Sequence, residues 1–333
     1  MSEDQRINHV AVIGAGSWGT ALANVSARAG HKVSLWGRDA GHIEVMKEAR
    51  QNIAYLPGIT LENSVLPSSD LQCVREADVI LLVVPAQAQR AVALSIRTLV
   101  RAGVPVVVCA KGIERTTRQF MAEVVSQAMP GLPVAVLSGP SFAHDVAKGL
   151  PTAVTIACNL PGIAKKLAAS LGTSAFRLYY SDDVRGVEIG GSAKNVLAIA
   201  CGIAAGRGLG ASANAALVAR GFAELRRFGA AFGAQSETLM GLSGLGDLVL
   251  TCGSEQSRNF AFGLALGRGK SLAEASGGKL AEGAFTAGVL VDMARDRDVE
   301  VPICEAVNAL LTGKIDIPSA IESLLLRPQR SEI

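Results

Sequence analysis

The chain has 333 residues, of which 49% are hydrophobic and 18% are charged. This length exceeds what one ordinary core serves, so we expect two domains, and the ample apolar fraction excludes a disordered protein. The net charge of +3 arises from 32 basic and 29 acidic residues spread along the whole length. Because no basic block exists, the charge pattern does not indicate a nucleic-acid partner.

Cysteine spacing and apolar runs bear on the compartment. The six cysteines lie far apart and form no CxxC pair, which is typical of reduced thiols and provides no metal-ligand spacing. The polar start MSEDQRIN leads directly into a predicted strand, so we expect no signal peptide. Apolar runs such as 79–84 and 196–205 are shorter than the roughly 18 residues of a membrane span. We therefore expect a cytoplasmic protein without a membrane span or a metal.

From residue 8 to about 180, short β-branched runs alternate with helical segments, which is typical of a doubly wound α/β sheet. The run 79–84 has no polar alternation, as expected for a central parallel strand covered on both faces. After Ser181 the remainder reads as helices broken by Gly-rich loops. We predict a Rossmann-type domain over residues 1–185 and an all-helical domain over 186–333. The predicted strands are 9–13, 32–36, 79–84, 106–109, 134–138, 153–157 and 176–180.

A glycine-rich turn follows the first predicted strand. Residues 10–23 read VAVIGAGSWGTALA and place Gly14, Gly16 and Gly19 between that strand and an Ala-rich helix. In this setting the first glycine makes a tight turn, the second lets a pyrophosphate approach the backbone, and the third lets helix and strand pack. The helix N-terminus faces the phosphates. We predict a dinucleotide site here, and the alternative is a turn of purely structural value.

The end of the second predicted strand bears on cofactor choice. It reads Leu35-Trp36-Gly37-Arg38-Asp39, where an NAD-specific protein usually carries an acidic group for the ribose hydroxyls. Gly37 leaves room and Arg38 offers a planar cation for a 2′-phosphate, which favours NADP, or use of both NADP and NAD. The alternative is a solvated arginine.

Two later loops are predicted at the edge of the sheet where ligands bind. VVVCAKGIE (106–114) brings Lys111 to the carboxyl end of a strand, and VAVLSGPSFAHDVA (134–147) brings Gly139, Ser141 and Ala143 to the same edge. Exposed lysines and turn glycines are common, but two such loops on one edge favour a site.

The stretch 188–206 reads EIGGSAKNVLAIACGIAAG and places Lys194 and Asn195 before an apolar run. On a helix, Leu197 and Cys201 share the face of Lys194. Apolar surroundings disfavour the charged ammonium, which suits a proton donor or acceptor working near neutral pH. The alternative is a lysine whose head reaches solvent at the end of a core helix.

Residues 241–263 combine a glycine-rich loop carrying Asp247 with a helix that begins near Ser257. Arg258 then lies in the first turn, where the positive end of the helix dipole disfavours a cation. A bound anion resolves this conflict, and Ser257, Arg258, Asn259 and the first backbone N–H groups form a cradle for a dianion. We infer a phosphorylated substrate, and the alternative is an arginine turned to solvent.

Three further residues attract attention by position. Glu282 can accept hydrogen bonds from a ribose or a nicotinamide amide, and it can equally cap a helix. Cys252 has no cationic neighbour in sequence to activate it, so we interpret it as structural. His144 falls on the helix after Pro140, and we interpret it as a surface histidine rather than a general acid.

The motifs together resemble those of the bacterial NAD(P)-dependent glycerol-3-phosphate dehydrogenases over nearly the full chain. They are GAGSWGTALA (14–23), CAKGIE (109–114), SGPSFA (138–143), GGSAKNVLAIA (190–200), GLSGLGDLVLTC (241–252), SRN (257–259) and LAEG (280–283). Ser192-Ala193, where relatives often have Ala-Leu, and Gly253, where they often carry a hydroxyl, depart from the pattern.

The resemblance implies a set of contacts and a reaction. At the dinucleotide it implies Ser17, Trp18, Arg38, Lys111, Ala143, Arg258, Leu280 and Glu282. Around the substrate it implies Lys111, Gly139, Ser141, Lys194, Asp247, Ser257, Arg258 and Asn259. A hydride passes to C2 of dihydroxyacetone phosphate while Lys194 gives the proton and Asn195 and Asp247 hold the lysine and the substrate hydroxyls. The resemblance further implies a fold like that of 6-phosphogluconate dehydrogenase, a homodimer and a role in phospholipid synthesis.

Two other functions stay open at this stage. A β-hydroxyacid or 6-phosphogluconate-type dehydrogenase also couples this turn to a helical domain and uses a lysine. A nucleotide-sensing binding protein without turnover would carry the turn but would not need the clustered Lys194, Asp247 and Arg258. The tyrosine-based short-chain reductases are disfavoured, because no lysine stands four residues after Tyr179 or Tyr180.

Overall fold

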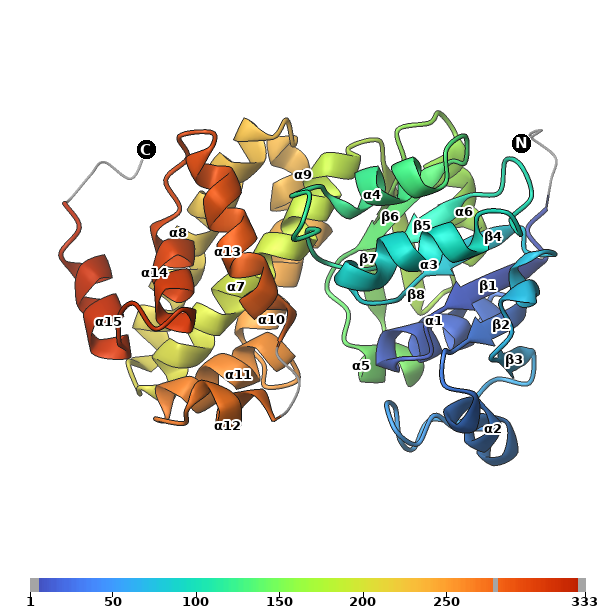
Figure 1. The fold of residues 1–333 in the computed structure, drawn as a ribbon, viewed down its shortest axis with the longest axis horizontal. Helices are drawn as coiled ribbons and strands as arrows, with labels where there is room; N and C mark the ends of the chain where they lie inside the picture. Colours follow the sequence, from blue (N-terminus) through green and yellow to red (C-terminus); the bar gives the residue numbers. More distant parts are fainter. Residues whose placement is uncertain (1–5, 278–280, 329–333) are drawn as a thin grey trace. The chain divides into compact units, whose positions relative to one another are not determined.

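The computed structural model describes residues 6–277 and 281–328 (Figure 1). The chain divides into two compact units, Met1–Glu188 and Ile189–Ile333, which we call the N-terminal and C-terminal units. The division falls within helix α7 (Val184–Gly206).

The described part of the N-terminal unit contains an eight-stranded sheet of order β3-β2-β1-β4-β5-β6-β7-β8. Neighbouring strands are parallel except for the β6–β7 pair, which is antiparallel. The strands are β1 (His9–Ile13), β2 (Lys32–Trp36), β3 (Val65–Ser68), β4 (Val79–Leu82), β5 (Val106–Val108), β6 (Val134–Ser138), β7 (Thr152–Ala157) and β8 (Phe176–Ser181). The predicted α/β layout is confirmed.

Both faces of this sheet are covered. On β1, Val10 and Val12 belong to one buried cluster, whereas Ala11 and Ile13 belong to another. Because successive side chains of a strand point to opposite faces, such a strand must be apolar throughout. The covering helices are α1 (Ser17–Arg28), α2 (Ala40–Ala49) and α6 (Ile163–Leu171) in the first cluster and α3 (Gln89–Ile96) and α4 (Met121–Ala128) in the second.

The strand predictions were right in position and less so at their ends. Strand β4 stops at Leu82 rather than at residue 84. Just after this end, the carbonyl of Val83 lies against Gly14, where an added Cβ would be 2.8 Å away. Strand β3 was missed, since its short sequence VLPS contains a proline, which usually argues against a strand. Here the proline is tolerated at the sheet edge.

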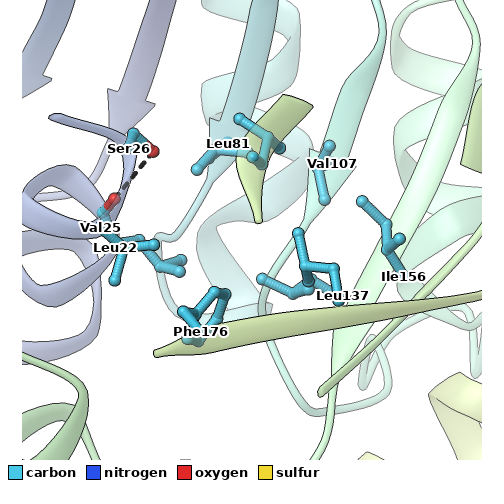
Figure 2. A pocket seen from close by; sticks show the side chains of 10 residues that line it. Leu22, Val25, Ser26, Leu81, Val107, Leu137, Ile156 and Phe176 are labelled. Atoms are coloured by element: carbon cyan, nitrogen blue, oxygen red, sulfur yellow. Dashed lines mark hydrogen bonds between the residues drawn. The ribbon is translucent and has the colours of Figure 1, made fainter. Parts of the chain in front are cut away.

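The buried cluster that includes Val10 and Val12, which we call the first core, contains a small apolar void of about 10 Å³ (Figure 2). Its single polar neighbour, Ser26, donates its hydroxyl to the carbonyl of Leu22 at 2.9 Å. A void of this size without polar partners stays dry, so we interpret it as imperfect packing and not as a ligand site. Its other walls are Val25, Leu81, Val107, Leu137, Ile156, Leu171, Phe176 and Leu178.

The C-terminal unit, where described, is helical, as predicted. After α7 follow α8 (Gly210–Ala231), α9 (Ser236–Met240), a π-helical turn (Leu242–Gly246), α10 (Asp247–Cys252), α11 (Arg258–Gly267), α12 (Leu272–Ser276), α13 (Glu282–Arg295), α14 (Pro302–Leu311) and α15 (Ile317–Leu325). Helix α7 as a whole is long and apolar enough to cross a membrane, contrary to the expectation from short runs, but 89% of its apolar window is buried inside the protein.

Helices α7 and α11 pack with their backbones in contact. A Cβ on Gly202 of α7 would be 2.1 Å from the carbonyl oxygen of Phe260, and one on Gly263 of α11 would be 2.1 Å from that of Ile199. Gly206 and Gly267, one turn further along each helix, are equally crowded. Glycine is therefore required at these positions because the partner is rigid backbone and not a flexible side chain.

We predict that Gly202→Ala destabilises the C-terminal unit by about 3 kcal/mol or more, since the two helices must separate. Gly288→Ala is the matched control. It lies inside α13, where the nearest atom to an added Cβ is the side-chain oxygen of Asn308 at 3.3 Å. The control should be neutral or stabilising by up to about 1 kcal/mol through helix propensity. Denaturant midpoints measure both, and equal effects would contradict the packing argument.

A buried carboxylate joins α8 to α14. Glu224, only 2% exposed, accepts hydrogen bonds from the backbone N–H groups of Ile303 (2.7 Å) and Cys304 (3.2 Å). These are among the first N–H groups of α14, which have no partner within their own helix. Burial raises the pKa of Glu224 to about 7, against the opposing effect of the N–H groups.

A raised pKa makes the native state bind a proton that the unfolded chain releases, so stability from this group falls as pH rises from about 4.5 to about 7. We predict that Glu224→Gln, which keeps an acceptor but cannot ionise, flattens the pH dependence of unfolding over that range. Urea midpoints at pH 5, 6, 7 and 8 measure it. An unchanged slope would show that Glu224 does not carry the effect.

Candidate active site

The glycine-rich turn has the geometry expected of a phosphate site. Gly14 has a φ of +126° and a Cβ there would meet the Val83 carbonyl, whereas a Cβ on Gly19 would lie 1.7 Å from the oxygen of Gly14. Both glycines are demanded by the packing of the protein itself. Gly16 differs, because a Cβ there would meet nothing within 4 Å. Gly16 also precedes α1 without any side-chain cap, so the N-terminus of this helix can receive an anion.

The next two residues of the turn, Ser17 and Trp18, make contacts within the N-terminal unit. The hydroxyl of Ser17 donates to the backbone oxygen of Tyr55 at 2.7 Å, so its side chain ties a later segment to the turn. Ser17 still contributes its backbone at the start of α1. Trp18 is partly buried and packs against the first core cluster.

Arg38 is exposed just after β2, as the predicted 2′-phosphate contact requires. Its neighbour Asp39 caps α2 by accepting from the backbone N–H of His42 at 3.0 Å. The prediction that Gly37 leaves room is wrong. A Cβ there would be 2.8 Å from Ile43 and 3.0 Å from Ala15, so the space is already filled by the protein.

The two later loops meet, as expected, at the carboxyl ends of the parallel strands β5 and β6. The ammonium of Lys111 donates to the backbone oxygen of Gly139 at 3.0 Å, and the hydroxyl of Ser141 donates to the same oxygen at 3.0 Å. Gly139 has a φ of +146°, and a Cβ added there would lie 2.8 Å from the Cα of Val154. Ala143 begins the short helix α5 (Ala143–Ala147) and packs against the first core.

The loop that carries Lys111 is anchored by a partly buried ion pair. Arg90 donates to both carboxylate oxygens of Glu114, at 2.9 and 2.7 Å, and also to Gln119 and Gln127. The Arg90 guanidinium lowers the pKa of Glu114, which therefore stays ionised. Such a fork-shaped contact fixes the loop geometry.

Lys194 is the centre of the C-terminal unit's polar interior. Its ammonium donates to Asp247 Oδ1 at 2.6 Å and to Thr251 Oγ1 at 2.6 Å, and the Thr251 hydroxyl donates in turn to Asp247 at 3.3 Å. The side chains of Lys194 and Asp247 are only 7% and 1% exposed. Apolar residues of similar volume are often as stabilising as a buried ion pair, so this arrangement is better explained by chemistry than by stability.

Two sequence expectations need correction here. Leu197 and Cys201 are buried on α7 as predicted, but the apolar setting does not leave the ammonium without a counter-charge, because the carboxylate of Asp247 lies 2.6 Å from it. Asp247 does not lie on a loop. Residues 242–246 form a π-helical turn and Asp247 begins α10. Thr251 was missed as a site residue, although its spacing of four from Asp247 places both on one helix face.

A second buried network joins three helices. The amide of Asn259 on α11 donates to Asn195 Oδ1 on α7 at 3.0 Å, and its oxygen accepts from the backbone N–H of Gly283 on α13 at 2.8 Å. Asn195 and Asn259 are 5% and 9% exposed. Asn195, which follows Lys194, is therefore held by Asn259, the residue that the sequence analysis predicted in the phosphate cradle.

Helix α11 begins where the sequence predicted. Ser257 caps it by accepting from the backbone N–H of Phe260 at 3.2 Å, and Arg258 is its exposed first residue. The Ser257 oxygen is thus already used within its own helix, while its proton can still be donated. Arg258 keeps the unfavourable position for a cation that led to the prediction of a bound anion.

The remaining predicted residues have mixed outcomes. Leu280 lies outside the described residues. Glu282 is the partly buried first residue of α13, where the positive end of the helix favours a carboxylate. His144 is an exposed residue of α5. A hydrogen bond with the Cys201 thiol, together with burial, raises the pKa of Cys252, and its structural role stays a prediction.

The six cysteines are free thiols, as predicted. Within residues 6–277 and 281–328, no three His, Cys, Asp or Glu side chains are grouped so as to hold a metal ion.

A phosphate-binding turn on a Rossmann-type sheet, together with a buried lysine–aspartate pair in a helical unit, defines the class of nicotinamide-dependent dehydrogenases. Comparison with known proteins gives the family. The model for the N-terminal part of the NAD-dependent glycerol-3-phosphate dehydrogenases matches residues 9–164, and that for the C-terminal part matches residues 183–322. The chain belongs to the NAD(P)-dependent glycerol-3-phosphate dehydrogenase family.

Individual relatives agree with this assignment. The chain is 61% identical to glycerol-3-phosphate dehydrogenase [NAD(P)+] of Azorhizobium caulinodans, covering 98% of each chain. It is 58% identical to that of a Bradyrhizobium strain, covering 98% of this chain and 99% of the relative. The crystal structure of glycerol-3-phosphate dehydrogenase from Coxiella burnetii matches with a TM-score of 0.92 and 41% identity, covering 96% of this chain and 99% of that one.

Proposed function

We propose that this protein catalyses the reversible NAD(P)H-dependent reduction of dihydroxyacetone phosphate to sn-glycerol 3-phosphate. The observation that carries the proposal is the buried centre of Lys194, Asp247 and Thr251 in the C-terminal unit. We further propose that the enzyme acts in the cytoplasm as a homodimer and supplies glycerol 3-phosphate for phospholipid synthesis. In this proposal the Rossmann-type domain, residues 1–185, binds the dinucleotide and residues 186–333 bind the substrate.

The residues of the N-terminal unit fit the dinucleotide. The open space beside Gly16 and the uncapped start of α1 suit a pyrophosphate, and the bound nicotinamide supplies or accepts the hydride. Lys111, Gly139, Ser141 and Ala143 stand on the same edge of the sheet and are assigned to the cofactor and the reacting end of the substrate.

The proton is assigned to Lys194. In reduction, C2 of the ketone gains a hydride and its oxygen gains a proton from the Lys194 ammonium, which is left as an amine. In oxidation the same amine takes the proton back. Asp247 is the counter-charge of the ammonium, and Thr251, which accepts from the lysine and donates to the aspartate, holds the ammonium in one orientation. Asn195, fixed by Asn259, is assigned to the substrate hydroxyls.

The phosphate is assigned to the N-terminus of α11. Arg258 supplies a planar cation, and Ser257 and the first backbone N–H groups of the helix supply further donors. Asn259 lies in the same turn, so substrate phosphate and the residues around Lys194 are linked through one buried amide.

We predict that Lys194→Ala lowers kcat by about 10²-fold or more while leaving NADPH affinity nearly unchanged, because the proton donor is lost but the cofactor turn is intact. Lys270→Ala, which removes an exposed lysine of the same unit, is the control and should keep kcat. Steady-state kinetics and fluorescence titration with NADPH measure both. Weaker NADPH binding with an unchanged kcat would refute the assignment.

We predict that Arg258→Ala raises KM for dihydroxyacetone phosphate by about 10-fold or more, since a charged hydrogen bond to the phosphate is lost. Arg268, just after the end of the same helix, serves as control, and Arg268→Ala should have little effect. Unphosphorylated dihydroxyacetone provides the decisive comparison. If Arg258→Ala weakens its use equally, the phosphate is not the group that Arg258 recognises.

We predict that Arg38→Ala raises KM for NADPH by about 10-fold and changes that for NADH little, because only NADPH carries the 2′-phosphate. The ratio of kcat/KM for the two cofactors measures this and needs no separate control. Equal losses with both cofactors would remove Arg38 as the source of preference.

A further inference from the structure

Asn52 lies in the connection between α2 and β3, and its side chain has no exposed surface. Its amide nitrogen donates to the backbone oxygen of Ala15 at 2.9 Å and to Thr20 Oγ1 at 2.7 Å. Its oxygen accepts from the backbone N–H of Tyr55 at 3.2 Å. A residue 37 positions away in sequence thus reaches into the glycine-rich turn.

Thr20 extends this contact to the next residue of the turn. Its hydroxyl accepts from Asn52 and donates to the backbone oxygen of Gly16 at 2.9 Å. Asn52 therefore holds the carbonyl of Ala15 directly and, through the Thr20 hydroxyl, adds a second hydrogen bond to the carbonyl of Gly16, which also accepts from the backbone N–H of Thr20 at 2.9 Å.

Fixing these carbonyls also fixes the N–H groups that face a phosphate. No cis peptide bond occurs among the described residues, and in a trans peptide the N–H points opposite to the C=O. The N–H groups of Gly16 and Ser17 must then point away from Asn52 and Thr20. The space beside Gly16 is open, so an anion can approach there.

We infer that Asn52 is a positioning residue for cofactor binding: it holds the backbone N–H groups of Gly16 and Ser17 in the orientation that receives the pyrophosphate. This inference rests on the proposed dinucleotide site at the glycine-rich turn. Because the pyrophosphate is common to both cofactors, Asn52 acts on NADPH and NADH alike, unlike Arg38.

The chain offers a closely matched control in Asn24. Asn24 is equally buried, and its side chain donates to the backbone oxygen of Thr60 at 2.9 Å and accepts from the backbone N–H of Glu62 at 3.1 Å. It ties α1 to the same connection as Asn52 does, but none of its described hydrogen bonds reaches residues 14–19.

The experiment compares Asn52→Ala with Asn24→Ala. The Kd values for NADPH and NADH are measured by fluorescence titration, KM for dihydroxyacetone phosphate is measured at saturating cofactor, and unfolding midpoints are measured in denaturant. We expect both variants to lose stability, and only Asn52→Ala to raise both cofactor Kd values, by roughly 10-fold and equally. KM for dihydroxyacetone phosphate should stay unchanged. If both variants weaken cofactor binding alike, or if neither does, the inference is overturned.

Two further variants complete the test. If Asn52→Ala does not fold, Thr20→Val decides, because it removes the hydroxyl that fixes Gly16 while keeping the side-chain shape. It should raise both Kd values by a smaller factor, and unchanged values would overturn the inference. Gly16→Ala separates this inference from the proposed site. Alanine fits there without strain, so a loss of cofactor binding with Gly16→Ala but not with Asn52→Ala rejects only the role of Asn52. Unchanged binding with Gly16→Ala rejects the site.

Discussion

The buried ammonium of Lys194 requires a counter-charge, and the packing of the C-terminal unit brings the carboxylate of Asp247 to it. Lys194 lies on α7 and Asp247 begins α10, 53 positions later, yet their charged atoms are 2.6 Å apart. Leaving either charge buried alone would cost several kcal/mol. Glycine at position 190 of α7 allows this close contact. Any side chain there would collide with the turn that leads into α10, because its Cβ would lie 2.4 Å from the backbone oxygen of Ser243.

Glycine serves the same purpose along the rest of α7. The paired glycines of α7 and α11 let two helix backbones touch, which brings Asn259 within hydrogen-bond distance of Asn195. Gly283 completes the arrangement, since a Cβ there would be 2.4 Å from the oxygen of Asn195. These glycines are thus required by close backbone packing around a polar centre, whereas Gly208, Gly233 and Gly269 lie in open turns with positive φ.

In the N-terminal unit, close packing shapes the backbone of the glycine-rich turn. Contacts within the protein explain Gly14 and Gly19, whereas a Cβ on Gly16 would meet nothing within 4 Å, which fits the proposed anion site. Two side chains join this turn to the segment around Tyr55: Asn52 donates to the oxygen of Ala15, and the hydroxyl of Ser17 donates to the oxygen of Tyr55. In both units, buried amide and hydroxyl groups hold the chemically important groups in place.

The sequence by itself determined the doubly wound sheet, the change to helices after residue 181, the glycine-rich turn and the start of α11 at Ser257, because hydrophobic period, glycine spacing and helix-capping residues are local signals. The apolar neighbours of Lys194 were also readable from the sequence, and its role in the reaction stays a prediction. Only the tertiary structure decided that Thr251 and Asp247 both accept hydrogen bonds from Lys194, that Ile43 fills the space beside Gly37, and that Asn52 reaches Ala15. These contacts join residues that are far apart in the chain or depend on which helix face turns inward, and no local pattern encodes either.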